Sequence, residues 1–209
     1  MSLRDHSPVW SAAAVACALA AWPAAARAQS DYDEDRPAFV LYLSGGAFSP
    51  LAHLDDGDRV KFTTGFAASG GTAYRVNRFL ALRGNFTFTR SEVRDESGRP
   101  LGPIATNSFN RFLYDGDVQL RYPLHDGMTP YVFLGGGGVT VQRDVARNRA
   151  AFTTGAGKVG GGLSYQLPDS GVGLHVEFAG WIYKWDRYGY DNLQFDTTLS
   201  AGISYRFHF

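Results

Sequence analysis

The sequence has a single cysteine, Cys17, close to its N-terminus. Residues 1–28 have the pattern of a cleaved Sec-type export signal, with Arg4 before an Ala-rich apolar stretch and Ala26-Arg27-Ala28 as the cleavage motif. Pro23 breaks the apolar stretch, which argues against a membrane anchor. Lipid modification at Cys17 is the alternative, but the residues before it lack the usual leucine. Cleavage after Ala28 leaves no thiol, which removes disulfides and argues against structural zinc, so we expect no cofactor and no metal.

An excess of charge of either sign is also missing. Lys and Arg together number 20, as do Asp and Glu, and removing residues 1–28 leaves 18 basic and 19 acidic side chains. This balance predicts no nucleic-acid partner, because such a partner requires a basic surface. Residues 29–36 form a short acidic lead, which we interpret as a solvated tail. The rest of the mature chain has no apolar run long enough to cross a bilayer as a helix.

What the sequence does contain is a long alternation of apolar and polar residues at its C-terminal end. One face is apolar, with Phe195, Leu199, Ala201, Ile203, Tyr205, Phe207 and Phe209, and the other is polar, with Gln194, Asp196, Thr198, Ser200, Ser204, Arg206 and His208. A period of two predicts a β-strand with two different faces. A barrel wall with lipid outside and a polar lumen inside requires this pattern.

Seven further segments carry strand patterns, with turn signals between them. We expect strands over residues 38–48, 62–76, 79–91, 109–124, 130–142, 152–167, 172–185 and 195–209. Short turns follow the second, fourth and sixth strands, and longer polar connections, among them residues 92–107 and 144–149, follow the others. This asymmetry and an even strand count are typical of outer-membrane barrels. We predict an all-β fold, a transmembrane eight-stranded antiparallel up-and-down β-barrel over residues 37–209; only the faces of residues 130–142 stay ambiguous, because Gly135 to Gly138 interrupt the pattern.

The same alternation assigns the charged strand residues to one face. A single Arg or Lys on the lipid face at mid-membrane costs roughly 2–4 kcal/mol, so we expect these side chains to point inward. A barrel of eight strands has room for its own side chains or one small ligand, which predicts a plugged lumen whose charges pair structurally. The predicted lumen network comprises Arg75, Arg83, Asp115, Asp117, Arg121, Lys158, His175, Glu177, Asp196 and Arg206.

The chain resembles the eight-stranded outer-membrane barrels of the OmpA, OmpX and opacity-protein type. The resemblance rests on the signal, the strand rhythm, glycine-rich stretches such as Ser44-Gly45-Gly46, and the terminal Tyr205-Arg206-Phe207-His208-Phe209. It implies export to the outer membrane of a Gram-negative bacterium, with residues 29–36 in the periplasm. It also implies that Tyr205, Phe207 and Phe209 form the assembly signal for the barrel-insertion machinery. Further partners implied are outer-membrane lipid, lipopolysaccharide and host or surface ligands bound by the loops.

Two patterns could carry chemistry. Gly155-Ala156-Gly157-Lys158-Val159-Gly160 matches a nucleotide-binding motif, but it continues into a strand instead of a helix, so we interpret its glycines as structural. Ser164 and His175 are expected to pair across strands with Glu177 nearby, an arrangement used in acyl transfer. A serine and a histidine in a lumen are more often hydrogen-bonded filler, and the predicted site is far from the outer leaflet. We therefore predict a protein that is not an enzyme.

Aromatic residues gather near the strand ends and predict two interfacial girdles. The outer girdle is expected to contain Phe66, Phe88, Phe112, Phe152 and Phe195. Trp181, Tyr183, Trp185, Tyr188 and Tyr190 surround the last loop and could form either an exposed adhesive patch or part of a girdle. Arg90, Arg94 and Arg99 are candidates for phosphate contacts with lipopolysaccharide.

The function that we expect is envelope structure and surface interaction through the extracellular loops. The alternatives are a narrow channel or carrier for small or hydrophobic molecules and, third, a lipid A-modifying enzyme.

Overall fold

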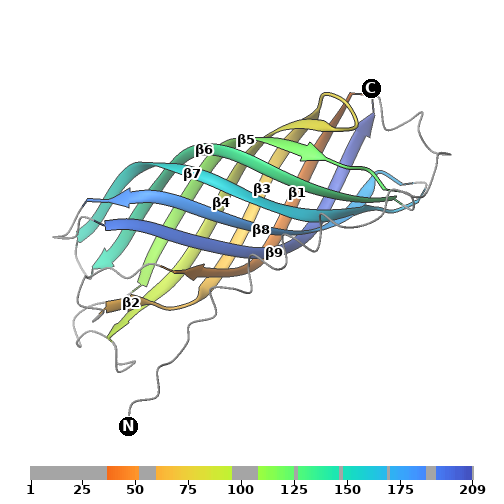
Figure 1. Ribbon diagram of the computed structural model, residues 1–209. Helices are drawn as coiled ribbons and strands as arrows, with labels where there is room; N and C mark the ends of the chain where they lie inside the picture. The colour runs from red at the N-terminus through yellow and green to blue at the C-terminus, as the bar shows by residue number, and fades with distance from the viewer. Residues whose placement is uncertain are drawn as a thin grey trace, which may run out of the picture.

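The computed structural model describes residues 37–51, 60–95, 108–124, 127–145, 148–168, 170–186 and 192–208 (Figure 1). The strands are β1 (Ala38–Pro50), β2 (Val60–Phe62), β3 (Gly65–Arg75), β4 (Leu80–Asp95), β5 (Ser108–Arg121), β6 (Met128–Val145), β7 (Asn148–Gln166), β8 (Val172–Trp185) and β9 (Asn192–His208). Within these residues, no helix is long and apolar enough to cross a membrane.

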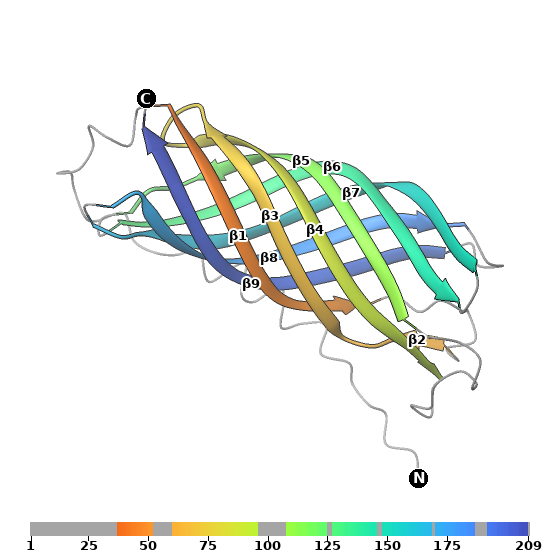
Figure 2. The ribbon, with the colours of Figure 1, turned by 180° about the vertical axis from the view of Figure 1, so that it is seen from behind.

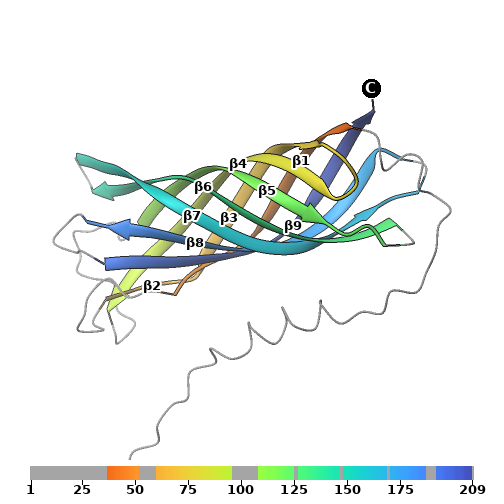
Figure 3. The ribbon, with the colours of Figure 1, turned by 45° about the horizontal axis from the view of Figure 1, so that its top comes forward.

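The strands form one closed antiparallel barrel, which confirms the predicted fold class. Each long strand pairs with the next along the chain, and β1 pairs with β9, so that Ala38 lies opposite His208. Figures 1 and 2, which show the molecule from opposite sides, place β1 and β9 side by side in a wall of inclined strands. Eight strands build the wall, since the short β2 only extends the end of β4. Figure 3 shows the same wall with its top turned forward.

Side chains alternate between the two faces of the wall, as the sequence pattern predicts. In β5 burial alternates residue by residue from Arg111 to Arg121. The exposed face of the barrel carries large apolar side chains, among them Leu43, Leu120, Leu134, Leu199 and Ile203. An apolar outer face and a polar inner face suit a barrel that is surrounded by lipid.

One end of the barrel is formed by short turns, which we call the short-turn end. In the first of these turns the Asn77 side-chain oxygen accepts hydrogen bonds from the backbone N–H groups of Phe79 (2.8 Å) and Leu80 (2.9 Å). Asn is favoured in turns because its side chain satisfies nearby backbone donors in this way. Gly127 has a φ of 77°, a left-handed conformation that glycine adopts without steric cost. The first residue of β1, Ala38, and the last residue of β9, His208, both lie at this end.

Two sequence-based expectations about the opposite end are wrong. Residues 144–149 were expected to form a polar loop, but β6 and β7 continue to the pair of Val145 and Asn148. A hairpin that extends past the membrane can be polar on both faces, so polarity there does not indicate a loop. The strand expected over residues 62–76 is divided into β2 and β3, because Val60–Phe62 pairs with the far end of β4.

Candidate functional site

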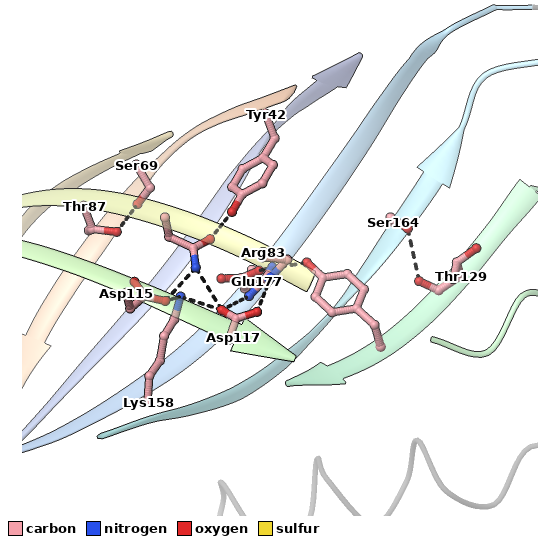
Figure 4. A network of polar contacts seen from close by, with 12 residues as sticks. Tyr42, Ser69, Arg83, Thr87, Asp115, Asp117, Thr129, Lys158, Ser164 and Glu177 are labelled. Atoms are coloured by element: carbon pink, nitrogen blue, oxygen red, sulfur yellow. Dashed lines mark hydrogen bonds and ion pairs between the residues drawn. The ribbon is translucent and has the colours of Figure 1, made fainter. Parts of the chain in front are cut away.

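The lumen is crossed at its middle by a group of ion pairs centred on Arg83 of β4 (Figure 4). The Arg83 guanidinium donates through Nε to Asp117 Oδ1 (2.6 Å) and through Nη2 to Asp117 Oδ2 (2.9 Å). Its Nη1 reaches across the lumen to Glu177 Oε2 of β8 at 2.6 Å. The guanidinium group thus binds one carboxylate with two of its nitrogens and a second carboxylate with its third nitrogen. Such a planar group forms a rigid link between opposite walls of the barrel.

Lys158 of β7 forms the second cationic centre of the same group. Its Nζ lies 3.0 Å from Asp115 Oδ1 and 3.3 Å from Asp117 Oδ2. Asn85 donates from Nδ2 to both aspartates, at 2.6 Å and 2.9 Å, and accepts a hydrogen bond from the Tyr42 hydroxyl.

Tyr131 completes the group, because its hydroxyl donates to Glu177 Oε2 at 3.1 Å. We call this group the central network: Tyr42, Arg83, Asn85, Asp115, Asp117, Tyr131, Lys158 and Glu177. Its members come from six strands of the wall.

The glycine run of β6 provides the space that the central network needs. Gly135 lies opposite Asp117 and Gly137 opposite Asp115 in the β5–β6 register. A Cβ atom at Gly135 would lie 2.4 Å from Asp117 Cβ, and one at Gly137 would lie 2.6 Å from Asp115 Cα. Only glycine fits at such distances, which settles the inward face of this strand.

A second buried ion pair lies nearer to the loop end of the barrel. Asp196 Oδ2 is 3.6 Å from Arg111 Nε and accepts a hydrogen bond of 2.6 Å from the Tyr183 hydroxyl. Arg111 Nη1 donates to Ser91 Oγ at 2.7 Å, and its guanidinium lies 4.9 Å from the centre of the Phe48 ring. Arg111 was absent from the predicted lumen residues, although it has the same strand parity as Asp115 and Asp117.

Aromatic side chains fill the lumen around this second ion pair. Phe109, Leu113, Val139, Val141, Trp181, Tyr183 and Trp185 are buried together, and we call them the aromatic plug. The Trp185 ring contacts Phe109 and Phe152 edge-on, with centroid distances of 6.0 Å and 4.9 Å. The expectation of an exposed or girdle position for Trp181, Tyr183 and Trp185 is therefore wrong, because the inward parity of Glu177 continues along β8. Phe152 likewise packs inward, whereas Tyr188 and Tyr190 lie outside the described residues.

The outward aromatic residues do form a row on the wall. Phe88 lies between Phe66 and Phe112, with ring-centroid distances of 5.7 Å and 5.3 Å, and Phe195 is exposed on the same outer face. At the short-turn end, Tyr205 and Phe207 face outward with their rings 4.8 Å apart, whereas Phe209 lies outside the described residues.

The remaining predicted lumen residues lie toward the short-turn end. Arg75, Arg121 and Arg206 are buried there. Ser164 and His175 are directly opposite each other in the β7–β8 register, but the Ser164 hydroxyl donates to the Thr129 carbonyl at 3.2 Å (Figure 4). The His175 ring instead contacts Tyr42 edge-on, at 5.9 Å between centroids. This geometry does not prepare the serine for nucleophilic attack, which requires a base that receives its proton. Among the described residues, no group of His, Cys, Asp and Glu could hold a metal ion.

A closed antiparallel barrel with an apolar outer face and a polar, filled interior defines a transmembrane β-barrel protein. Residues 11–207 match the family model described as the outer membrane protein beta-barrel domain, and the chain belongs to this family. No curated protein matches the chain significantly.

Solved structures with the same fold include two bacterial surface and outer-membrane proteins. Neisserial surface protein A is 17% identical with a TM-score of 0.59, over 81% of this chain and 97% of that one. Outer membrane protein OprG of Pseudomonas aeruginosa is 14% identical with a TM-score of 0.50, over 84% and 98%. These similarities concern the fold.

Proposed function

We propose that this protein is a closed outer-membrane barrel of a Gram-negative bacterium that contributes to envelope structure and presents its loops for surface interaction. The observation that carries the proposal is the filling of the lumen at two levels, by the central network and by the aromatic plug. Eight strands enclose a space that side chains can fill completely, and here buried ion pairs and aromatic rings occupy it. The role of the lumen charges in this proposal is structural.

The proposal includes an assembly route. Residues 1–28 are removed as a Sec-type export signal, residues 29–36 remain as a short acidic lead in the periplasm, and Tyr205, Phe207 and Phe209 form the assembly signal read by the barrel-insertion machinery. Two observations support this route: the match to the barrel family and the outward, lipid-facing position of Tyr205 and Phe207.

The partners proposed are outer-membrane lipid, lipopolysaccharide and surface or host ligands that bind the loops. Arg90 supports a lipopolysaccharide contact, because it is exposed on the outer face beside the aromatic row, directly opposite Phe66. A guanidinium group beside the outer aromatic row can bind a phosphate group of the outer leaflet. Of the other two candidates, Arg99 lies outside the described residues, as does the side chain of Arg94.

Conductance tests the proposal directly. Mature protein inserted into a planar lipid bilayer should give no stable ohmic current, with insertion verified by flotation of the same preparation with liposomes. Stable ohmic conductance would overturn the closed lumen and support the narrow channel or carrier. A change in the mass spectrum of lipid A on expression of the protein would instead support the lipid-modifying enzyme.

A further inference from the structure

The β6–β7 hairpin extends beyond its neighbour β8 at the loop end of the barrel. β7 begins at Asn148 and pairs with β6 from that residue to Tyr165, but it pairs with β8 only from Ala156 onward. Residues 148–154 therefore have one edge that no strand of the described chain covers, and we call it the overhanging edge. It is roughly 20 Å long at the usual strand rise per residue.

The backbone groups that point to the overhanging edge follow from the register of the hairpin. Val145 pairs with Asn148 across a connection of two residues, so these two residues exchange backbone hydrogen bonds, and bonded pairs then alternate along the ladder. The residues that direct their N–H and C=O groups away from β6 are then Arg149, Ala151 and Thr153. The Thr140 and Thr153 hydroxyls lie 2.8 Å apart, as expected for a non-bonded pair, whose side chains approach more closely.

The overhanging edge lacks the features that usually protect exposed strand edges. Such edges commonly carry lysine, proline or a bulge. Residues 150–154 contain no charged residue and no proline, and the β6–β7 register continues to the end of the hairpin without a bulge. A Cβ atom at Gly155, where β7 and β8 separate, would have no heavy atom within 4 Å. The edge is therefore open to another extended chain.

The lumen stays closed behind the overhanging edge. The inward ring of Phe152 packs against Trp185, with 4.9 Å between the ring centroids, and both rings are part of the packing of the aromatic plug. These two side chains close the fork between β7 and β8 on its lumen side. A chain that pairs with the overhanging edge therefore adds a strand outside the lumen. In outer-membrane barrels the loop end faces the cell exterior.

Charge distinguishes between the partners that could pair with this edge. Residues 143–149 contain three arginines and one aspartate, and the end of β8 adds one charge of each sign, Lys184 and Asp186. Two copies of the chain insert into one membrane in the same direction, so their overhanging edges could pair only in parallel, with the arginine-rich ends side by side. Like charges at that position disfavour such a dimer. An acidic extended segment instead combines backbone hydrogen bonds with charge complementarity.

We infer that the overhanging edge is a docking site for an extended, acidic peptide segment of another protein, which adds a strand to β7 outside the membrane. The inference rests on the surface role proposed above, and it names the kind of partner and the way in which it binds. Backbone hydrogen bonds provide the affinity, and the positive charge of the hairpin selects acidic segments.

A labelled eight-residue peptide that alternates threonine and glutamate tests the inference. Its binding to the mature protein in maltoside detergent is followed by fluorescence anisotropy at low salt, and saturable binding is expected. Replacing glutamate by lysine, or placing two adjacent prolines at the centre of the peptide, should weaken binding by about tenfold or more. Thr153→Pro should have the same effect, because it removes an edge-facing N–H group, a change that an edge strand tolerates. Thr153→Val keeps this N–H group and is the matched control.

Absence of saturable binding of the acidic peptide to the wild-type protein would overturn the inference, even if Thr153→Pro failed to fold. Equal binding of the two-proline peptide would also overturn it, since the contact would then not use the backbone. A wild-type dimer that Thr153→Pro dissociates would overturn it in favour of a second copy of the chain. None of these results bears on the closed lumen, which the bilayer conductance measures separately.

Discussion

At the residue scale, Asp117 is the most highly connected acid in the lumen. It accepts hydrogen bonds from Arg83, Asn85 and Lys158, and its side chain is fully buried. Removing one partner of a buried pair lowers the free energy of unfolding, because the charge of the other partner is left uncompensated. The stability of the network therefore depends on all its members being present.

Asp117→Asn should destabilise the barrel strongly, because an NH2 donor replaces one of the two buried carboxylate oxygens that accept from Arg83, Asn85 and Lys158. Removing one partner of a buried pair costs about 3–5 kcal/mol in free energy of unfolding. Urea unfolding in lipid vesicles measures this loss. Asp186→Asn, at an exposed position after β8, is the control and should change the midpoint little. An unchanged midpoint for Asp117→Asn would contradict the structural role of the network.

Gly135→Ala tests the space beside Asp117 without changing any charge. The added methyl group would lie 2.3 Å from the Gly116 carbonyl oxygen and 2.4 Å from Asp117 Cβ, so the strands must separate. Overpacking of this kind costs about 1–3 kcal/mol, measured by the same urea unfolding. Gly155→Ala is the matched control on the neighbouring strand, where a Cβ atom meets nothing within 4 Å. Equal stability of the two variants would show that β6 does not approach β5 this closely.

At the element scale, strand parity was predictable and loop boundaries were not. The outward and inward faces of β5 and β9 follow directly from the alternation of apolar and charged residues. The end of β6 could not be predicted from Arg143 and Asp144. Polar residues of this kind are found both in a hairpin that extends past the membrane and in a loop, so they do not distinguish the two. The inward position of Trp181 and Trp185 could have been predicted from the parity of Glu177, but their position near the last loop suggested an exposed patch.

Tryptophan fluorescence distinguishes the aromatic plug from an exposed patch. Of the four tryptophans, only Trp181 and Trp185 remain after removal of residues 1–28, and both are about 1% exposed. We expect emission at short wavelength and little quenching by acrylamide in water or by brominated lipid tails, since both rings face the lumen. N-acetyltryptophanamide provides the fully accessible reference. Strong quenching by acrylamide would favour the patch.

At the scale of the whole molecule, the central network and the aromatic plug fill the lumen at two levels. The partners of each charge could not be predicted from the sequence: Arg83 and Asp117 are neighbours in the β4–β5 register, but the contact of Arg83 with Glu177 crosses the barrel. The sequence predicts which residues point inward, whereas closure of the barrel determines which of them meet.

Filling at two levels predicts that removing one of them will not open a channel. Arg83→Ala with Asp117→Ala shortens the central network, and Trp181→Ala with Trp185→Ala removes most of the ring volume of the aromatic plug. Each double variant should give no stable current in a planar bilayer, while all four substitutions together should give one. A current from either double variant would show that the other level is not a barrier. Circular dichroism verifies that each variant retains its strands.

The pairing of β1 with β9 has a consequence for the timing of assembly. Ala38 and His208 come from opposite ends of the barrel sequence, and every other wall contact joins wall strands that follow one another along the chain. The hairpins can therefore form one after another, but both free edges stay unpaired until the last strand arrives. Unpaired edges template aggregation, and contacts between the two ends of a chain form slowly. A nascent chain released without β9 leaves one edge of β1 unpaired, because β3 covers only the other edge, so a truncation there should yield aggregate instead of a smaller barrel.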